Sequence, residues 1–133
     1  MMRSTRTIFI LLVIGVLLCA CSGQQAPKSK PSRPADEAGA IAAVKEINEA
    51  QTNYIRRTRR YAQRNEELIA EKLLAKEPLV EGYTISMLPS PDAGSYTVTA
   101  TPDSAEGKHL FSDLTEVIRF EVGKPATKES PTN

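Results

Sequence analysis

The spacing of apolar residues changes along the chain, and each spacing predicts a different element. From residue 36 to about residue 60, apolar or small residues recur every three or four positions, which places them on one face of an amphipathic helix. Asp36 and Glu37 open this helix, because carboxylates favour the free amides of a first turn. The stripe consists of Ala40, Val44, Ile47, Gln51, Tyr54 and Tyr61, and is widened by Ile41, Ala43, Ala50 and Ile55.

A second, shorter helix is predicted after Asn65, whose side chain is a candidate N-cap. Pro78 would end this helix, because proline cannot continue the backbone hydrogen bonds. Its buried side would consist of Leu68, Ile69, Leu73 and Leu74.

From Gly82 onward, apolar and polar residues alternate with a period of two, which is typical of strands. Proline-rich or polar turns separate the apolar segments, at residues 89–94 and 102–108. Four sequential strands with short loops predict an antiparallel meander whose apolar face packs on the long helix. The expected strands are residues 83–87, 96–101, 109–112 and 117–122. The predicted fold class is therefore α+β, with a long amphipathic helix on a small sheet.

The first residues have the pattern of an export signal. Arg3 and Arg6 precede an apolar run over residues 8–18, which is shorter than the roughly 20 residues that a bilayer span needs. Residues 1–20 are therefore predicted to be a cleaved signal peptide. Residues 22–35 are polar and proline-rich, and we expect a disordered tether there.

The sequence Leu18-Cys19-Ala20-Cys21 resembles the lipobox of bacterial lipoproteins. The resemblance implies cleavage before Cys21, attachment of diacylglycerol to its thiol and usually N-acylation, so that a membrane is the first partner. Ser22 implies the periplasmic face of the outer membrane, if the cell has two membranes. An ordinary signal peptide or short anchor that happens to contain cysteine is the alternative.

Processing at Cys21 would leave no free thiol for a disulfide, a metal or a nucleophile. Loss of Arg3 and Arg6 would lower the formal net charge from +1 to −1. A nearly neutral chain has no global field that attracts nucleic acid or anionic lipid. Any recognition by charge would therefore be local.

The expected organisation is a signal peptide (1–20), lipidated Cys21 with its tether (21–35), one domain (36–123) and a polar, disordered tail (124–133).

Several segments of the predicted domain resemble type IV pilins and the pseudopilins of type II secretion. Residues 42–54 (AAVKEINEAQTNY) resemble the amphipathic half of the pilin helix. Three further segments resemble strands of pilins. They are residues 82–85 (GYTI), 96–102 (YTVTATP) and 111–113 (FSD), the last followed by 117–119 (VIR). Glu116 stands where the family pattern has glycine, so we expect a distorted turn there. The resemblance implies a pilin-like α+β head.

The chain departs from the pilin pattern before the helix. Pilins keep a long apolar half-helix that forms the filament core, whereas here a proline-rich tether separates the apolar run from the helix. No acidic residue precedes Asp36. We therefore do not expect this chain to build a filament by the pilin route.

His109 is the only histidine, and Asp113 could reach it across a turn. A general base needs such a positioned partner, and a metal site usually needs three or four ligands. A histidine on a strand surface is the simpler interpretation. The residues therefore predict no catalytic site, no metal site and no cofactor.

The strongest local charge feature is a run of arginines near the end of the long helix, with tyrosines at 54 and 61 beside it. One interpretation is a solvated helix end, where cations are favourable. Another is docking to an acidic protein or to anionic lipid, and a third is binding of nucleic acid. The candidate anion-binding residues are Arg56, Arg57, Arg59, Arg60 and Arg64.

The leading functional hypothesis is a lipid-anchored, non-enzymatic envelope protein. Its pilin-like domain would bind another protein, such as a component of a pilus or of a type II secretion assembly. One alternative is a small ligand-binding or catalytic periplasmic domain. A passive structural lipoprotein is the other.

Overall fold

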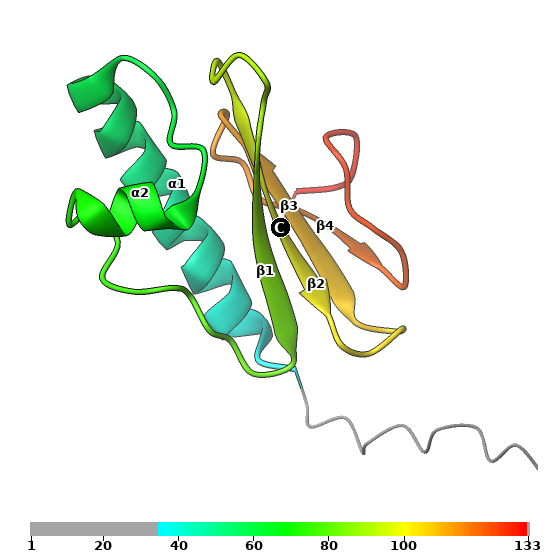
Figure 1. Ribbon diagram of the computed structural model, residues 1–133. Helices are drawn as coiled ribbons and strands as arrows, with labels where there is room; N and C mark the ends of the chain where they lie inside the picture. The colour runs from blue at the N-terminus through cyan, green and yellow to red at the C-terminus, as the bar shows by residue number, and fades with distance from the viewer. Residues whose placement is uncertain (1–34, 133) are drawn as a thin grey trace, which may run out of the picture.

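The computed structural model describes residues 35–132 and contains two helices and one four-stranded sheet in this part of the chain. Both helices lie on the same side of the sheet, so the domain has two layers (Figure 1). The elements follow the order α1 (Glu37–Thr58), α2 (Asn65–Ala70), β1 (Tyr83–Pro89), β2 (Tyr96–Pro102), β3 (Lys108–Asp113) and β4 (Arg119–Val122). The predicted α+β fold class is confirmed. The expected signal peptide, Cys21 and almost the whole expected tether lie outside the described residues.

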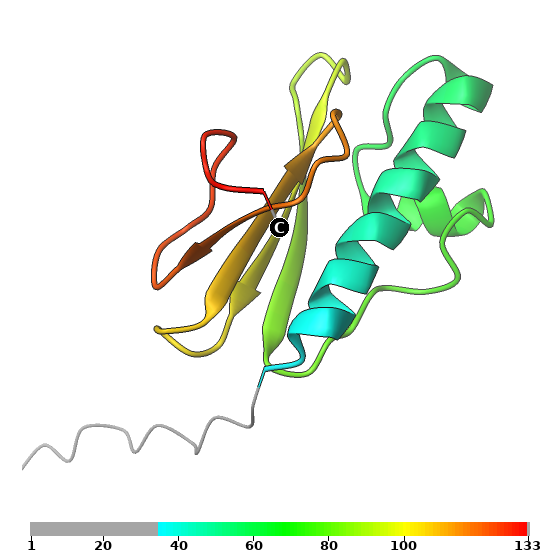
Figure 2. The ribbon, with the colours of Figure 1, turned by 180° about the vertical axis from the view of Figure 1, so that it is seen from behind.

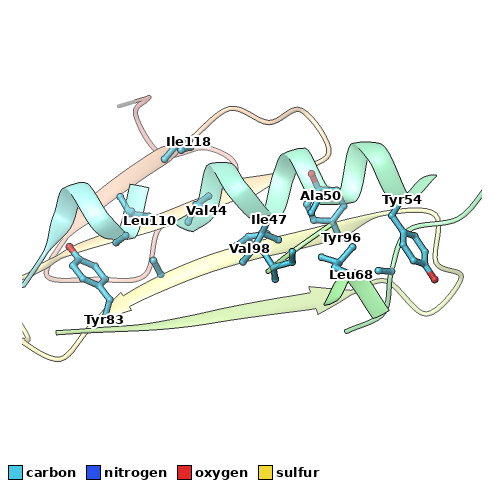
Figure 3. Packing of buried hydrophobic residues seen from close by; sticks show 14 residues of the cluster. Val44, Ile47, Ala50, Tyr54, Leu68, Tyr83, Tyr96, Val98, Leu110 and Ile118 are labelled. Carbon is cyan, nitrogen blue, oxygen red and sulfur yellow. The ribbon is translucent and has the colours of Figure 1, made fainter. Parts of the chain in front are cut away.

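Helix α1 begins where its sequence predicts. The carboxylate of Asp36 accepts a hydrogen bond from the Gly39 amide at 2.8 Å, which satisfies one free donor of the first turn. The apolar stripe faces the sheet, and Val44, Ile47 and Ala50 are almost completely buried (Figure 3). Burial of this face is the main source of the helix's stability, because a single helix is marginal in water.

The sheet is an antiparallel meander with the strand order β1-β2-β3-β4. Side chains alternate between the two faces along each strand, and the apolar set faces α1. The inner face consists of Tyr83, Ile85, Met87, Tyr96, Val98, Ala100, Leu110, Ser112 and Phe120. No described helix covers the outer face of the sheet (Figures 1 and 2).

Two buried polar side chains of α1 fix the helix against the rest of the domain. Asn48 donates to the Ser112 hydroxyl at 2.7 Å and accepts from the Tyr96 hydroxyl at 3.2 Å. Gln51 binds both the amide and the carbonyl of Ala62, at 2.9 and 3.0 Å. Since a buried polar group without a partner is costly, these bonds specify one register of helix on sheet.

Helix α2 is shorter than the sequence predicts and starts differently. It ends at Ala70, eight residues before Pro78, and Arg64 occupies the N-cap position without a side-chain bond. The Asn65 side chain instead donates to Glu77 at 2.9 Å, so the expected asparagine cap is wrong. The Glu67 carboxylate accepts from the Gln63 amide at 3.0 Å, just before the N-cap residue.

Residues 124–132 pack against the sheet, which differs from the disordered tail that their composition predicts. The Phe120 amide donates to the carbonyl of Pro131 at 2.9 Å, and the Arg119 guanidinium donates to that of Ser130 at 3.0 Å. Ala126 and Ser130 are buried. The free edge of β4 offers backbone donors that sequence periodicity does not reveal, and the tail covers them.

The domain has two distinct ends. The chain enters at Ala35, beside the start of β1 and the β2–β3 loop, and we call this the tether end (Figure 2). Residues 56–64 lie at the opposite end, beside the β1–β2 loop, and we call this the arginine end. The 22 residues of α1 separate the two ends by about 33 Å. Within residues 35–132, no helix has the length and apolar character that a bilayer crossing requires.

Candidate functional site

The arginine end is formed by the last turn of α1 and the loop that follows. Arg56 and Arg57 lie in the last turn, where cations interact favourably with the helix dipole. Arg59 ends the helix in the left-handed conformation, with φ of 66°, and its amide donates to the Ile55 carbonyl at 2.9 Å. A positive φ is strained for a residue with a Cβ, and glycine is the usual choice there. The chain thus turns back at an arginine.

Arg60 is part of the structure of this end. Its guanidinium donates to the carboxylate of Glu67 at 2.8 Å and lies over the ring of Tyr54, 5.4 Å from the centroid. The Tyr54 hydroxyl donates to the same carboxylate oxygen at 2.8 Å. Glu67 therefore joins the end of α1 to the start of α2 and neutralises one arginine.

The ionisation of Glu67 fits this role. Partial burial raises the pKa of its carboxyl, but the hydrogen bonds from Tyr54, Arg60 and the Gln63 amide outweigh burial and lower the pKa below its usual value. Burial and the bond to Glu67 raise the pKa of Tyr54. The carboxylate is therefore ionised and the phenol neutral near neutral pH.

The other four arginines are exposed and differ in their partners. Arg57 lies 3.8 Å from the Glu71 carboxylate, in an exposed pair that contributes little. Arg56, Arg59 and Arg64 have no carboxylate partner among residues 35–132. The structure thus brings the predicted cluster together at one end, but it leaves three of the five guanidinium groups available to a partner.

The charge of the remaining domain makes this end distinctive. Residues 35–132 contain all 16 Asp and Glu residues and 12 of the 17 Lys and Arg residues, which gives a formal charge of −4. Without the five arginines, the same residues carry −9. The arginine end is therefore a local positive region on an acidic domain, and a local field of this kind attracts anionic partners.

The alternative site at His109 and Asp113 is not assembled. Both residues lie on β3, four positions apart, which corresponds to roughly 13 Å along a strand. Asp113 instead accepts from the amide and the hydroxyl of Thr115, at 2.9 and 2.6 Å. The sheet register places His109 opposite Glu121.

Two further features of the described residues concern metal ligands and surface hollows. No group of three or more His, Cys, Asp or Glu side chains within residues 35–132 could hold a metal ion. Two hollows, of about 290 and 480 Å³, flank residues 77–81. Neither is lined by His109 or Asp113.

Comparisons with known proteins identify no relative. No protein-family model, no curated protein and no solved structure matches the chain.

Proposed function

We propose that this protein is a lipid-anchored, non-enzymatic envelope protein whose arginine end docks onto an acidic partner protein. The three exposed arginines without a carboxylate partner carry the proposal, because they stand on a domain that is otherwise acidic. Arginine suits such docking, since its planar fork binds carboxylates in pairs of hydrogen bonds.

The arginines also lie at the end of the domain opposite the expected anchor. A lipid on Cys21 would hold the tether end, whereas the arginine end lies about 33 Å away along α1. A proline-rich tether of 14 residues reaches at most roughly 40 Å. The lipid alone would therefore not fix the basic end against the bilayer, and this end would remain accessible to an acidic protein.

The pilin-like features refine the class of partner. The helix-on-meander order and the sequence of residues 42–54 resemble those of a pilin head, but the expected tether separates the apolar run from the helix, unlike in a filament subunit. We propose that it binds a component of a pilus or secretion assembly without entering the filament core.

The lipid anchor is tested by replacing Cys21 with serine in the full chain. We expect the unmutated chain in the membrane fraction, with the mass of a processed and acylated protein. The C21S chain should accumulate at the mass of the unprocessed precursor. If the two chains differed in mass only by the exchange of sulfur for oxygen, Cys21 would not be modified.

The docking site is tested with the triple variant R56E/R59E/R64E. Crosslinking in intact membranes should recover an envelope protein with the unmutated chain and at least tenfold less of it with this variant. The matched control is K45E/K124E/K128E, which makes the same change in net charge at exposed lysines elsewhere. Equal loss in both variants would mean that only total charge matters. Binding of the purified chain to DNA or to anionic vesicles, lost in the arginine variant alone, would favour those partners instead.

A further inference from the structure

The two edges of the sheet differ in a way that the proposed function does not use. The edge of β4 is covered by residues 124–132, whereas β1 has no neighbouring strand on its outer side (Figure 1). Natural proteins usually protect such an edge with charges, a bulge or a covering segment. Strand β1, with the sequence YTISMLP, contains no charged residue and only a terminal proline.

The hydrogen-bond register shows which backbone groups of β1 are free. The amide of Asp103 donates to the carbonyl of Gly82, and the amide of Ser90 donates to that of Ser95. In an antiparallel ladder the bonded pairs alternate, so the even-numbered residues of β1 bond to β2. The backbone groups of Ile85 and Met87 therefore point to the open edge, where no described residue pairs with them.

We infer that a second copy of this chain occupies this edge, with the two β1 strands antiparallel and Ser86 opposite Ser86. This register pairs Ile85 of each copy with Met87 of the other through four backbone hydrogen bonds. Every free donor and acceptor of these two residues is then satisfied.

The residues at the two ends of β1 favour this register over the two adjacent registers. Val80 bridges to Tyr83 and accepts its amide, so a shift toward the start of the strand is obstructed. A shift toward Pro89 would leave the Ile85 carbonyls without a donor, because proline has no amide hydrogen. Leu88, which is 59 % exposed, would pack beside Thr84 of the second copy.

Charge complementarity favours a second copy as the occupant. An antiparallel pair places the arginine end of each copy alongside the tether end of the other. Among residues 35–132, the tether end carries exposed Asp36, Asp103 and Glu106 beside Lys108, whereas Lys28, Lys30 and Arg33 precede it in the sequence. Opposite charges at both ends of a symmetric pair favour association and select its orientation.

The contact is short, since only residues 84–88 pair. Interfaces of this size are at the weak end of specific association. We therefore expect an equilibrium that depends on concentration, and confinement to a membrane surface would promote the dimer. The pairing itself does not require lipidation.

Cysteine crosslinking tests the register directly, using the purified full chain in detergent with a mild oxidant. In the inferred pair, residues 86 and 86 face each other at a non-hydrogen-bonded position, where Cα atoms are about 4.5 Å apart and a disulfide can form. We expect S86C to give a covalent dimer. T84C alone and L88C alone should not, whereas an equal mixture of T84C and L88C chains should.

The unmutated chain measures the background from Cys19 and Cys21. Equal dimer yields from all variants would indicate random collision and overturn the inference, as would the absence of a dimer with S86C. A crosslink of S86C to another protein in membranes, without the dimer, would mean that the edge accepts a different occupant. Each of these outcomes leaves the C21S and arginine-variant experiments unaffected, so the two proposals fail separately.

Discussion

Glu67 binds one of the five arginines, Arg60, and thereby distinguishes it from the exposed arginines of the arginine end. It binds Arg60 and Tyr54 through one carboxylate oxygen and the Gln63 amide through the other. From sequence alone the five arginines form one group, because spacing shows proximity along the helix but not which carboxylate folds back onto them. Substitution of Arg60 would therefore disturb the fold, whereas substitution of Arg56, Arg59 or Arg64 would test recognition.

The left-handed conformation of Arg59 yields a prediction about stability and binding together. R59G should stabilise the domain by about 1 kcal/mol, because glycine adopts a positive φ without strain, while it removes one exposed charge. The control R56G places glycine inside the last turn of α1 and should cost about 1 kcal/mol. Urea unfolding measures both, and a lower stability of R59G than of the unmutated chain would contradict the prediction.

The low pKa of Glu67 predicts an acid dependence of stability. In the folded protein the ionised carboxylate is favoured, so its contribution is present above the pKa of the unfolded chain, about 4.3. The contribution is lost as the pH falls through the lower folded pKa. E67Q should reduce the free energy of unfolding by about 1–2 kcal/mol near neutral pH. It should also make the free energy of unfolding depend less steeply on pH at acid pH.

The neighbour Glu66 provides the control for this measurement. It is exposed, and E66Q should change stability by less than about 0.5 kcal/mol. Denaturant midpoints between about pH 2 and 7 would measure the curves. An acid limb of E67Q as steep as that of the unmutated chain would refute the assignment.

At the scale of elements, the periodicity of apolar residues predicts which faces pack together, but it does not predict which side chains cap the helices. The stripe of α1 and the alternation in β1 and β2 lead to the observed layers, because burial imposes those periods. The expected asparagine cap of α2 is wrong because the Asn65 side chain donates instead to Glu77, twelve residues along the chain. Glu116 is instructive, since glycine was expected there and the structure gives it φ of 60°. Its carboxylate accepts from the Thr52 hydroxyl, an interaction that glycine cannot make.

The packed tail predicts that truncation affects the sheet. A chain that ends after Gly123 would lose three hydrogen bonds to β4, each worth about 1 kcal/mol. It would also expose the β4 edge. We expect a lower unfolding temperature and aggregation that increases with concentration.

The exposed pair Lys128 and Glu129 gives the control for truncation. K128A/E129A keeps the backbone and the buried Ser130, so its thermal unfolding and light scattering should match those of the unmutated chain. Equal stability of the truncated chain would instead mean that the tail contributes nothing to the edge.

At the scale of the whole molecule, the distance between the two ends gives the expected tether a measurable role. Deletion of residues 25–33 would reduce its reach from roughly 40 Å to about 15 Å. If the proposed function holds, the deleted chain should stay attached to the membrane, because the lipid remains. Its crosslinking to the partner protein should fall. A Gly/Ser segment of equal length should restore crosslinking, and full crosslinking by the deleted chain would show that reach is not required.

The junction at Ala35 determines how a pull on the tether would reach the domain. The Asp36 amide donates to the Glu81 carbonyl at 3.1 Å, and Gly82 has φ of 74° and approaches Ala35 so closely that a Cβ there would lie 2.9 Å from its Cα. Tension would therefore be divided at once between the first turn of α1 and the start of β1. Force shared by two elements strains both together instead of unwinding the helix turn by turn, so the domain would resist a pull applied at Ala35.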